Sequence, residues 1–257
     1  VKRSCMKWTR ISVFTFLLGC CFELCAQLNT YTFLQDTIEY PYQSLENVLG
    51  NKENSGLISF LNEDGIGGNQ TTGLGIPIGF TFKFNGEDYD RFGVVNTGWV
   101  ALGKSQLGNQ AVDLGQLSNN PLNAAGPANE KLRPRISALG THIQGNGINT
   151  SLTYQTLGES PNRSLVVRWS KYVLPISSTN NYTKLNFQIV LNEHDNSIEI
   201  QYGDCLLAGI NQTFSCYVGV GGFTTADFIN RKTPASHNWN LTVGGTKSDD
   251  RCVINSI

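Results

Sequence analysis

The closest match to a chemical motif runs from Gly98 to Ser105, where GWVALGKS fits the G-x-x-x-x-G-K-S/T pattern of phosphate-binding loops. Such a loop needs small residues that turn successive backbone N–H groups toward a phosphate, and a helix must follow at once. Here Trp99, Val100 and Leu102 favour a strand instead. We therefore predict a buried strand, no nucleotide binding, and an isolated surface charge at Lys104.

Glu87, Asp88 and Asp90 come closest to the paired carboxylates that glycoside hydrolysis needs. They fall in and after a predicted hairpin turn, where acidic side chains are ordinarily solvated. The sequence has no Gly-x-Ser-x-Gly elbow and no His-Glu-x-x-His helix, and its three histidines lie far apart. We predict that the chain is not an enzyme, and a hydrolase ranks third among the functions considered.

Asn62, Glu63 and Asp64 bring oxygen ligands together directly before a glycine, as calcium loops do. The full twelve-residue ligand pattern is absent, so an ordinary turn is the alternative interpretation. These three residues are the candidate metal ligands, and calcium is the one cofactor considered.

Two further features concern ligands and cross-links in an exported chain. Cys205 and Cys216 flank a segment between two strand signals, and a disulfide there would restrict the unfolded chain by roughly 2.5–3 kcal/mol. Cys252 is left without an evident partner.

Trp239 lies in the polar stretch SHNWN and is the candidate aromatic residue for stacking on a sugar ring.

The elements that must position these residues are strands. Phe80, Phe82 and Phe84 alternate with polar residues, so their rings share one face. Asn85-Gly86 is typical of a type I′ hairpin turn, and further strands follow to Val95 and from Trp99. Because the apolar face of this meander must be covered, we predict an all-β, antiparallel, jelly-roll-like β-sandwich of roughly ten short strands.

The stretch from Ser105 to Arg135 lacks sustained periodicity and is rich in Asn, Gly, Gln and Pro. A plain connection inside a compact domain is rarely as long as roughly thirty residues. Segments of that length tend to be functional or disordered.

The composition and the first residues indicate export. Of the 257 residues 15% are charged and the net charge is −1, which argues against nucleic acid as a partner. Residues 1–26 resemble a signal peptide with an apolar run from Ile11 to Phe22, which is too short for a membrane span. Cleavage after Ala26 is the favoured prediction, and a lipidated Cys20 is the alternative. Residues 1–5 read as an upstream extension.

We accordingly predict a single sandwich domain over residues 27–245 and a secreted or outer-surface location. Residues 246–257 then read as the start of a following segment, cut short where the sequence stops.

The order of the strand motifs resembles a module common in exported proteins of Bacteroidota, and more distantly the nidogen-type extracellular domain. The matching motifs are FTFKFNG (80–86), FGVVNTGWVALG (92–103), SLTYQTLG (151–158), PNRSLVVRW (161–169), FQIVLNE (187–193), IEIQYG (198–203) and DFINR (227–231). Thr97 and Arg168 depart from the residues usual at their positions, which would disturb any site the family shared there.

The resemblance implies a non-catalytic, secreted β-sandwich. In this family the module is usually the N-terminal part of longer surface proteins exported by the type IX route. A structural or adhesive module with an unknown protein or glycan partner at the cell surface is therefore the first hypothesis. A carbohydrate-binding module is the alternative, because jelly-roll sandwiches often bind glycans through exposed aromatic side chains.

Overall fold

The computed structural model describes residues 28, 31–37, 39–41, 43–50, 57–145, 149–174, 183–203, 206–207, 214–230, 239–241 and 250–256. The predicted leader, residues 1–26, lies outside these ranges. No helix within them is long and apolar enough to cross a membrane.

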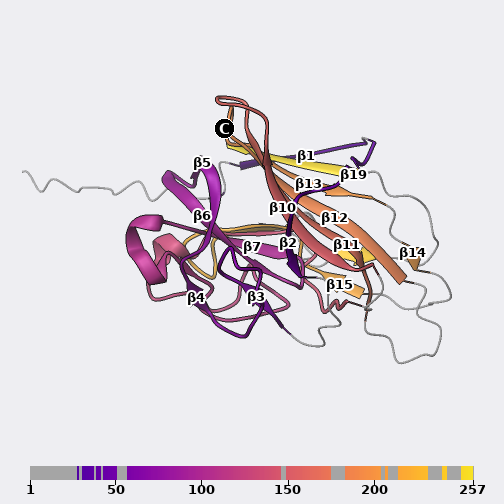
Figure 1. Cartoon of the computed structure of the whole chain (residues 1–257), viewed down its shortest axis with the longest axis horizontal. Helices are drawn as coiled ribbons and strands as arrows, with labels where there is room; N and C mark the ends of the chain where they lie inside the picture. Colours follow the sequence, from indigo (N-terminus) through magenta and orange to yellow (C-terminus); the bar gives the residue numbers. More distant parts are fainter. Residues whose placement is uncertain are drawn as a thin grey trace, which may run out of the picture.

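The larger of two antiparallel sheets has the strand order β1-β19-β13-β12-β11-β10-β2, with β14 paired to β12 (Figure 1). Its middle is a meander of four consecutive strands, β10 to β13. The bounds are β1 (Tyr31–Thr37), β2 (Asn47–Gly50), β10 (Ser151–Leu157), β11 (Ser164–Tyr172), β12 (Thr183–Asn192), β13 (Ile198–Tyr202), β14 (Leu206–Leu207) and β19 (Asp250–Ser256).

The smaller sheet has the order β17-β16-β9-β7-β6-β3, with β5 also paired to β6. Its strands are β3 (Ser59–Phe60), β5 (Ile76–Phe84), β6 (Glu87–Val95), β7 (Trp99–Gly103), β9 (Arg135–Ser137), β16 (Gly219–Gly221) and β17 (Phe228–Asn230). Two small pairs lie outside both sheets: β4 (Thr72–Gly73) with β8 (Val112–Asp113), and β15 (Phe214–Cys216) with β18 (Trp239–Leu241).

One apolar core joins the two sheets. Phe82, Phe84 and Phe92 of the smaller sheet belong to the same buried cluster as Trp169 and Phe187 of the larger sheet. All of them are fully buried, and Trp169 stacks on Phe187 with ring centroids 5.1 Å apart. The predicted all-β antiparallel sandwich is therefore confirmed.

The predicted meander is β5, β6 and β7. Asn85 and Gly86 have φ of 50° and 79°, the positive values that the type I′ turn requires. Every second residue of β5 from Ile76 to Phe84 is buried, as the alternation predicts.

β5 also ties the sheets together at one end. Its pairing with β6 is interrupted between Pro77 and Phe82. There the Ile78 carbonyl accepts a hydrogen bond from the Thr156 hydroxyl at 2.7 Å, and the Gly79 carbonyl accepts one from the Arg163 guanidinium at 2.5 Å. Both donors come from the larger sheet or its β10–β11 connection, so this interruption fixes the spacing of the two layers.

The smaller sheet is buried on both faces. Val100 and Leu102 of β7 face the main core, whereas Trp99 and Ala101 face a second cluster with Val112 and Leu114. This outer face is covered by Leu61 and by residues of the aperiodic stretch 105–135. The stretch forms the short 3-10 helices η2 (Ser105–Gln110) and η3 (Glu130–Leu132) around β8. Burial on both sides explains why β7 is a continuous apolar run instead of an alternating one.

Two buried arginines hold this covering segment in place. The Arg135 guanidinium lies 5.4 Å from the Trp99 ring centroid and donates to the carbonyls of Leu114 and Pro121. Arg133 donates to the carbonyls of Leu122 at 2.8 Å and of Gly222 at 2.7 Å. Burial, with the charge of Arg133 beside it, lowers the pKa of Arg135 to about 10.

Arg168 plays the same part on the larger sheet. It is buried, and its guanidinium donates to the Gln188 side chain at 2.7 Å and to the carbonyls of Pro41 and Gln43. The departure from the family pattern at this position thus has a structural role, because Arg168 anchors the irregular segment before β2.

The end of the described chain differs from the sequence-based domain boundary. Residues 246–257 read as the start of a following segment, but Asp250–Ser256 is β19, which pairs with β1 on one side and β13 on the other. The larger sheet of the sandwich therefore continues past residue 245. Sequence reasoning missed this strand because its two partners are more than forty residues away, and hydrophobic alternation does not reveal long-range pairing.

Trp99→Ala should destabilise the fold by about 3–5 kcal/mol, because it removes a fully buried ring that packs on Arg135 and whose N–H donates to the Ser118 carbonyl at 3.0 Å. Urea unfolding of the two proteins measures this difference. Leu107→Ala, in η2 at a residue that is 38% exposed, serves as the control and should cost less than about 1 kcal/mol. Equal losses in the two variants would contradict a packed second cluster.

Candidate functional site

A polar cleft of about 370 Å³ opens beside the Asn85-Gly86 turn. The turn directs β6 back along β5, and Arg91 in the middle of β6 pairs with Gly103 at the end of β7. The residues that follow β7 therefore lie beside the first half of β6. Charged and polar side chains from both strand ends and from η2 line the cleft, among them Glu87, Asp88, Asp90, Lys104, Ser105 and Gln106.

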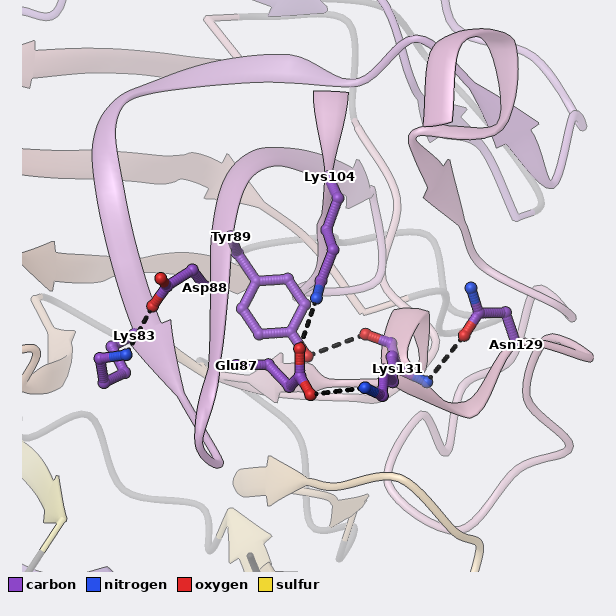
Figure 2. Close-up of polar contacts among 7 residues, drawn as sticks. All are labelled: Lys83, Glu87, Asp88, Tyr89, Lys104, Asn129 and Lys131. Atoms are coloured by element: carbon purple, nitrogen blue, oxygen red, sulfur yellow. Dashed lines mark hydrogen bonds and ion pairs between the residues drawn. The ribbon is translucent and has the colours of Figure 1, made fainter. Parts of the chain in front are cut away.

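Glu87 lies between two lysine side chains in the lining of this cleft (Figure 2). One carboxylate oxygen lies 2.7 Å from the Lys104 ammonium and the other lies 2.9 Å from the Lys131 ammonium. The Lys104 side chain is only 13% exposed, and its ammonium lies 5.2 Å from the centroid of the Tyr89 ring. Glu87 therefore joins β6, β7 and the covering segment through charge-assisted contacts.

Tyr89 and Asn129 fix the position of Lys131. The buried Tyr89 hydroxyl donates to the Lys131 carbonyl at 2.8 Å, and the Asn129 side chain accepts from the Lys131 backbone N–H at 3.1 Å (Figure 2). Burial, and then the nearby charge of Glu87, raise the pKa of Tyr89 above its usual range, so this hydroxyl stays protonated.

The other two carboxylates of the cleft are also engaged. Asp88 pairs with Lys83 at 2.7 Å on the exposed side of the hairpin. Asp90 accepts hydrogen bonds from the backbone N–H of Ser105, at 2.7 Å, and from its hydroxyl. Each acid of the cleft thus has a donor, and Glu87 and Asp88 are paired with lysines.

The pairing of Glu87 with two lysines determines its protonation state, and therefore which reactions the cleft could support. The hydrogen bonds from Lys104 and Lys131 lower the pKa of Glu87, so it is ionised near neutral pH. A general acid for glycoside hydrolysis needs a raised pKa instead. The arrangement suits the binding of hydroxyl and amide groups, which can share its donors and acceptors.

Lys104 corrects one sequence prediction. It was expected to be an isolated surface charge, but the structure pairs it with Glu87 in a mostly buried contact. The neighbouring prediction is confirmed, since Trp99–Gly103 is a strand with all five residues buried and not a phosphate-binding loop. Sequence reasoning missed Lys131 and Asn129 altogether, because no periodicity in the covering segment indicates which of its side chains turn inward.

The predicted calcium ligands lie in an exposed turn. The Asp64 side chain accepts from the Ile66 N–H at 2.9 Å, and Gly65 has a φ of 68°. Asn62 and Glu63 line a smaller cleft of about 260 Å³, on the other side of Ser105, which Arg91 also lines. A guanidinium there would repel a cation. Within the described ranges no group of three His, Cys, Asp or Glu side chains gathers as metal ligands do, and calcium binding stays a prediction.

The remaining predicted site residues fall partly outside the described ranges. Cys216 is buried in β15, and Cys205 lies outside those ranges, so their disulfide stays a prediction. Trp239 begins β18, where it pairs in register with Cys216. Its backbone is therefore part of a strand and not of an end loop, and sugar stacking by its ring also stays a prediction.

Two packed antiparallel sheets with a polar cleft at one hairpin define an all-β module of the sandwich class. A family model described as "NIDO related" matches residues 31–249, and the chain belongs to this family. It is accordingly an extracellular module, distantly related to the nidogen-type domain. Comparisons with curated proteins and with solved structures find no match.

Lys104→Ala should destabilise the fold by about 1–2 kcal/mol at pH 7, because Glu87 keeps only the more exposed of its two lysine partners. Lys83→Ala, which breaks an exposed pair, is the matched control and should cost less than about 0.5 kcal/mol.

The difference should also depend on pH. Since the pKa of Glu87 is lower in the fold than its ordinary 4.5, its pairing stabilises the fold fully above that value. The stabilisation is lost as the pH falls through the lower pKa of the folded state. Urea unfolding at pH 7 and pH 3 should therefore show a smaller Lys104→Ala effect at the lower pH, and an equal effect at both would contradict the assigned role of Glu87.

Proposed function

We propose that this chain is a non-catalytic structural or adhesive module of the bacterial cell surface, and that it forms the N-terminal part of a larger multidomain protein. The single observation that carries the proposal is the match of an extracellular family over residues 31–249. The signal-peptide pattern before it supports secretion or outer-surface display. The resemblance to Bacteroidota modules favours the type IX export route.

The state of the cleft supports a non-catalytic role. Glu87 is held ionised between the ammonium groups of Lys104 and Lys131. Asp90 accepts a hydrogen bond from the Ser105 backbone N–H. The hydrogen bonds from Lys104 and Lys131 lower the pKa of Glu87, whereas a catalytic acid needs a raised pKa. Exposed side chains of the cleft, such as Asp88 and Gln106, can form hydrogen bonds to a bound ligand. Such contacts are suited to binding and not to proton transfer.

Fluorescently labelled chain 27–257 should bind saturably to Bacteroidota cells, and excess unlabelled chain should displace it. Flow cytometry over a concentration series measures the binding. Pretreating the cells with protease or with glycosidases distinguishes a protein partner from a glycan. Binding that is linear in concentration and unaffected by the unlabelled chain would argue against an adhesive role.

Carbohydrate binding is the second candidate, and the polar cleft favours it. Sugar hydroxyl groups both donate and accept hydrogen bonds, so a cleft with balanced carboxylate and ammonium groups suits them better than a purely acidic or basic one. Asp88 and Gln106 are exposed side chains on the cleft wall. Trp239 is the candidate stacking residue at a second location.

A glycan array with the wild-type chain and two variants tests this candidate. If the cleft binds sugar, Asp88→Asn should reduce retention of a bound glycan about tenfold, the loss expected for one charge-assisted hydrogen bond. If Trp239 binds it instead, only Trp239→Ala should reduce retention. Glu159→Gln, an exposed acid outside the cleft, should change nothing. An array with no bound glycan would eliminate this candidate, and cleavage of a bound glycan would make the chain a hydrolase.

A further inference from the structure

Arg91 in β6 is a half-buried arginine that lines the smaller cleft of about 260 Å³. Within the described part of the chain its guanidinium makes no hydrogen bond and no ion pair. The other arginines with described side chains all donate to carbonyl or carboxylate oxygens, namely Arg133, Arg135, Arg163 and Arg168. A guanidinium presents its donors in a planar fork, so an unpaired one in a cleft indicates a place for an acceptor-rich ligand.

The stem of the Arg91 side chain is fixed by the chain around it. Along β6, Arg91 shares the outer face of the smaller sheet with Gly93, where an added Cβ would meet Leu61 and Val112 of the second cluster. A Cβ at Gly75 would lie 2.9 Å from the Arg91 Cβ, and Gly75 has a φ of 71°. The Gly75 N–H donates to the Leu61 carbonyl at 2.8 Å, which holds this turn against the stem. The start of the Arg91 side chain is therefore preorganised, which lowers the ordering cost of binding.

Other groups in the lining of the smaller cleft suit hydroxyl groups. The half-buried Asn62 amide can donate and accept, and the exposed Glu63 carboxylate accepts. The Ser105 hydroxyl donates to Asp90 and keeps lone pairs for a further donor. Leu74, which is 52% exposed, adds an apolar surface. The smaller cleft thus places a cation beside hydrogen-bonding groups and one apolar side chain.

These groups define the charge and the size of the ligand. A guanidinium fork matches the two oxygens of a carboxylate. Glu63 in the same lining would repel a second negative charge, which disfavours phosphate dianions. Pockets for drug-sized ligands measure about 300–1,000 Å³, so a cleft of about 260 Å³ accommodates a single ring. A ring that carries one carboxylate and several hydroxyl groups meets these requirements.

The carboxyl end of a peptide is a less suitable ligand for this cleft. Its last side chain would need apolar enclosure, and Leu74 is the only large apolar residue in the described lining. Ring hydroxyl groups, by contrast, can use both Asn62 and Glu63.

We propose that the smaller cleft binds an acidic sugar of the hexuronic acid class. Arg91 holds the sugar carboxylate, and Asn62 and Glu63 contact ring hydroxyl groups. Leu74 packs on the C–H groups of the ring. The proposal goes beyond the proposed function, because it uses neither the Glu87 side chain nor Trp239 and does not require an adhesive role.

NMR titration of chain 27–257 with sugars, in the presence of EDTA to exclude calcium, tests the proposal. D-Galacturonate and D-glucuronate should bind with a Kd on the order of 1 mM, the affinity expected for ligands of this size. Galactose and glucose, which lack the carboxylate, should bind at least about tenfold more weakly. Trigalacturonate that binds more tightly than galacturonate would identify a polysaccharide as the source, and equal affinity would identify the free sugar. N-acetyl-leucine represents the carboxyl end of a peptide.

Arg91→Gln should reduce the affinity for galacturonate about tenfold or more and change the Tm by less than about 2 °C, because the guanidinium loses no partner. Arg91→Lys keeps the charge without the fork and should have an intermediate affinity. Asn62→Ala should also weaken binding. Lys184→Gln, at an exposed cation of β12, is the matched control and should change nothing. Asp88→Asn, in the Glu87 cleft, should leave galacturonate binding unchanged.

Equal affinity for galacturonate and galactose, or an unchanged affinity in Arg91→Gln, would overturn the proposal. No binding of either hexuronate would overturn it as well. N-acetyl-leucine that binds more tightly than the hexuronates would assign the smaller cleft to a peptide instead. Each of these results leaves the carbohydrate candidate for the Glu87 cleft intact, because that candidate depends on the response to Asp88→Asn.

Discussion

The burial of β7 on both faces is the constraint from which most of the architecture follows. A strand with Trp99 on one side and Val100 and Leu102 on the other cannot lie at a surface, so the sandwich needs a third layer outside its smaller sheet. Much of this layer comes from the stretch that follows β7, which has little regular structure of its own. Its backbone groups must therefore be satisfied individually, and Arg133 and Arg135 donate to several of its carbonyls.

The same three layers produce the polar cleft. The covering segment passes over the hairpin and brings Lys131 to Glu87, while β7 brings Lys104 to the other oxygen of that carboxylate. Opposite charges thus meet at the junction of three segments, which are β6, the end of β7 and η3. The side chains of this junction are preorganised, because each is held by its neighbours.

The strands and the sandwich could be predicted from the sequence because period-two alternation and the Asn85-Gly86 turn are local signals. What could not be predicted depends on long-range contacts. Lys104 looked like a solvated strand end, since nothing near it in sequence indicates Glu87 as a partner. Arg168 was expected to disturb any site that the family shared at its position. Its structural role was not predicted, because it donates to carbonyls of residues more than a hundred positions earlier. β19 looked like the start of another segment for the same reason.

The buried arginines hold the irregular segments through main-chain carbonyls, and this determines which sequence changes the module can tolerate. Every residue type offers the same carbonyl, so the segments held by Arg133, Arg135 and Arg168 can exchange most of their outward side chains without losing their attachment. The extracellular module thus has a fixed frame whose exposed side chains are free to diversify. Grafting foreign peptide sequences into the exposed positions of 105–130 would use this property directly, with the arginines left in place.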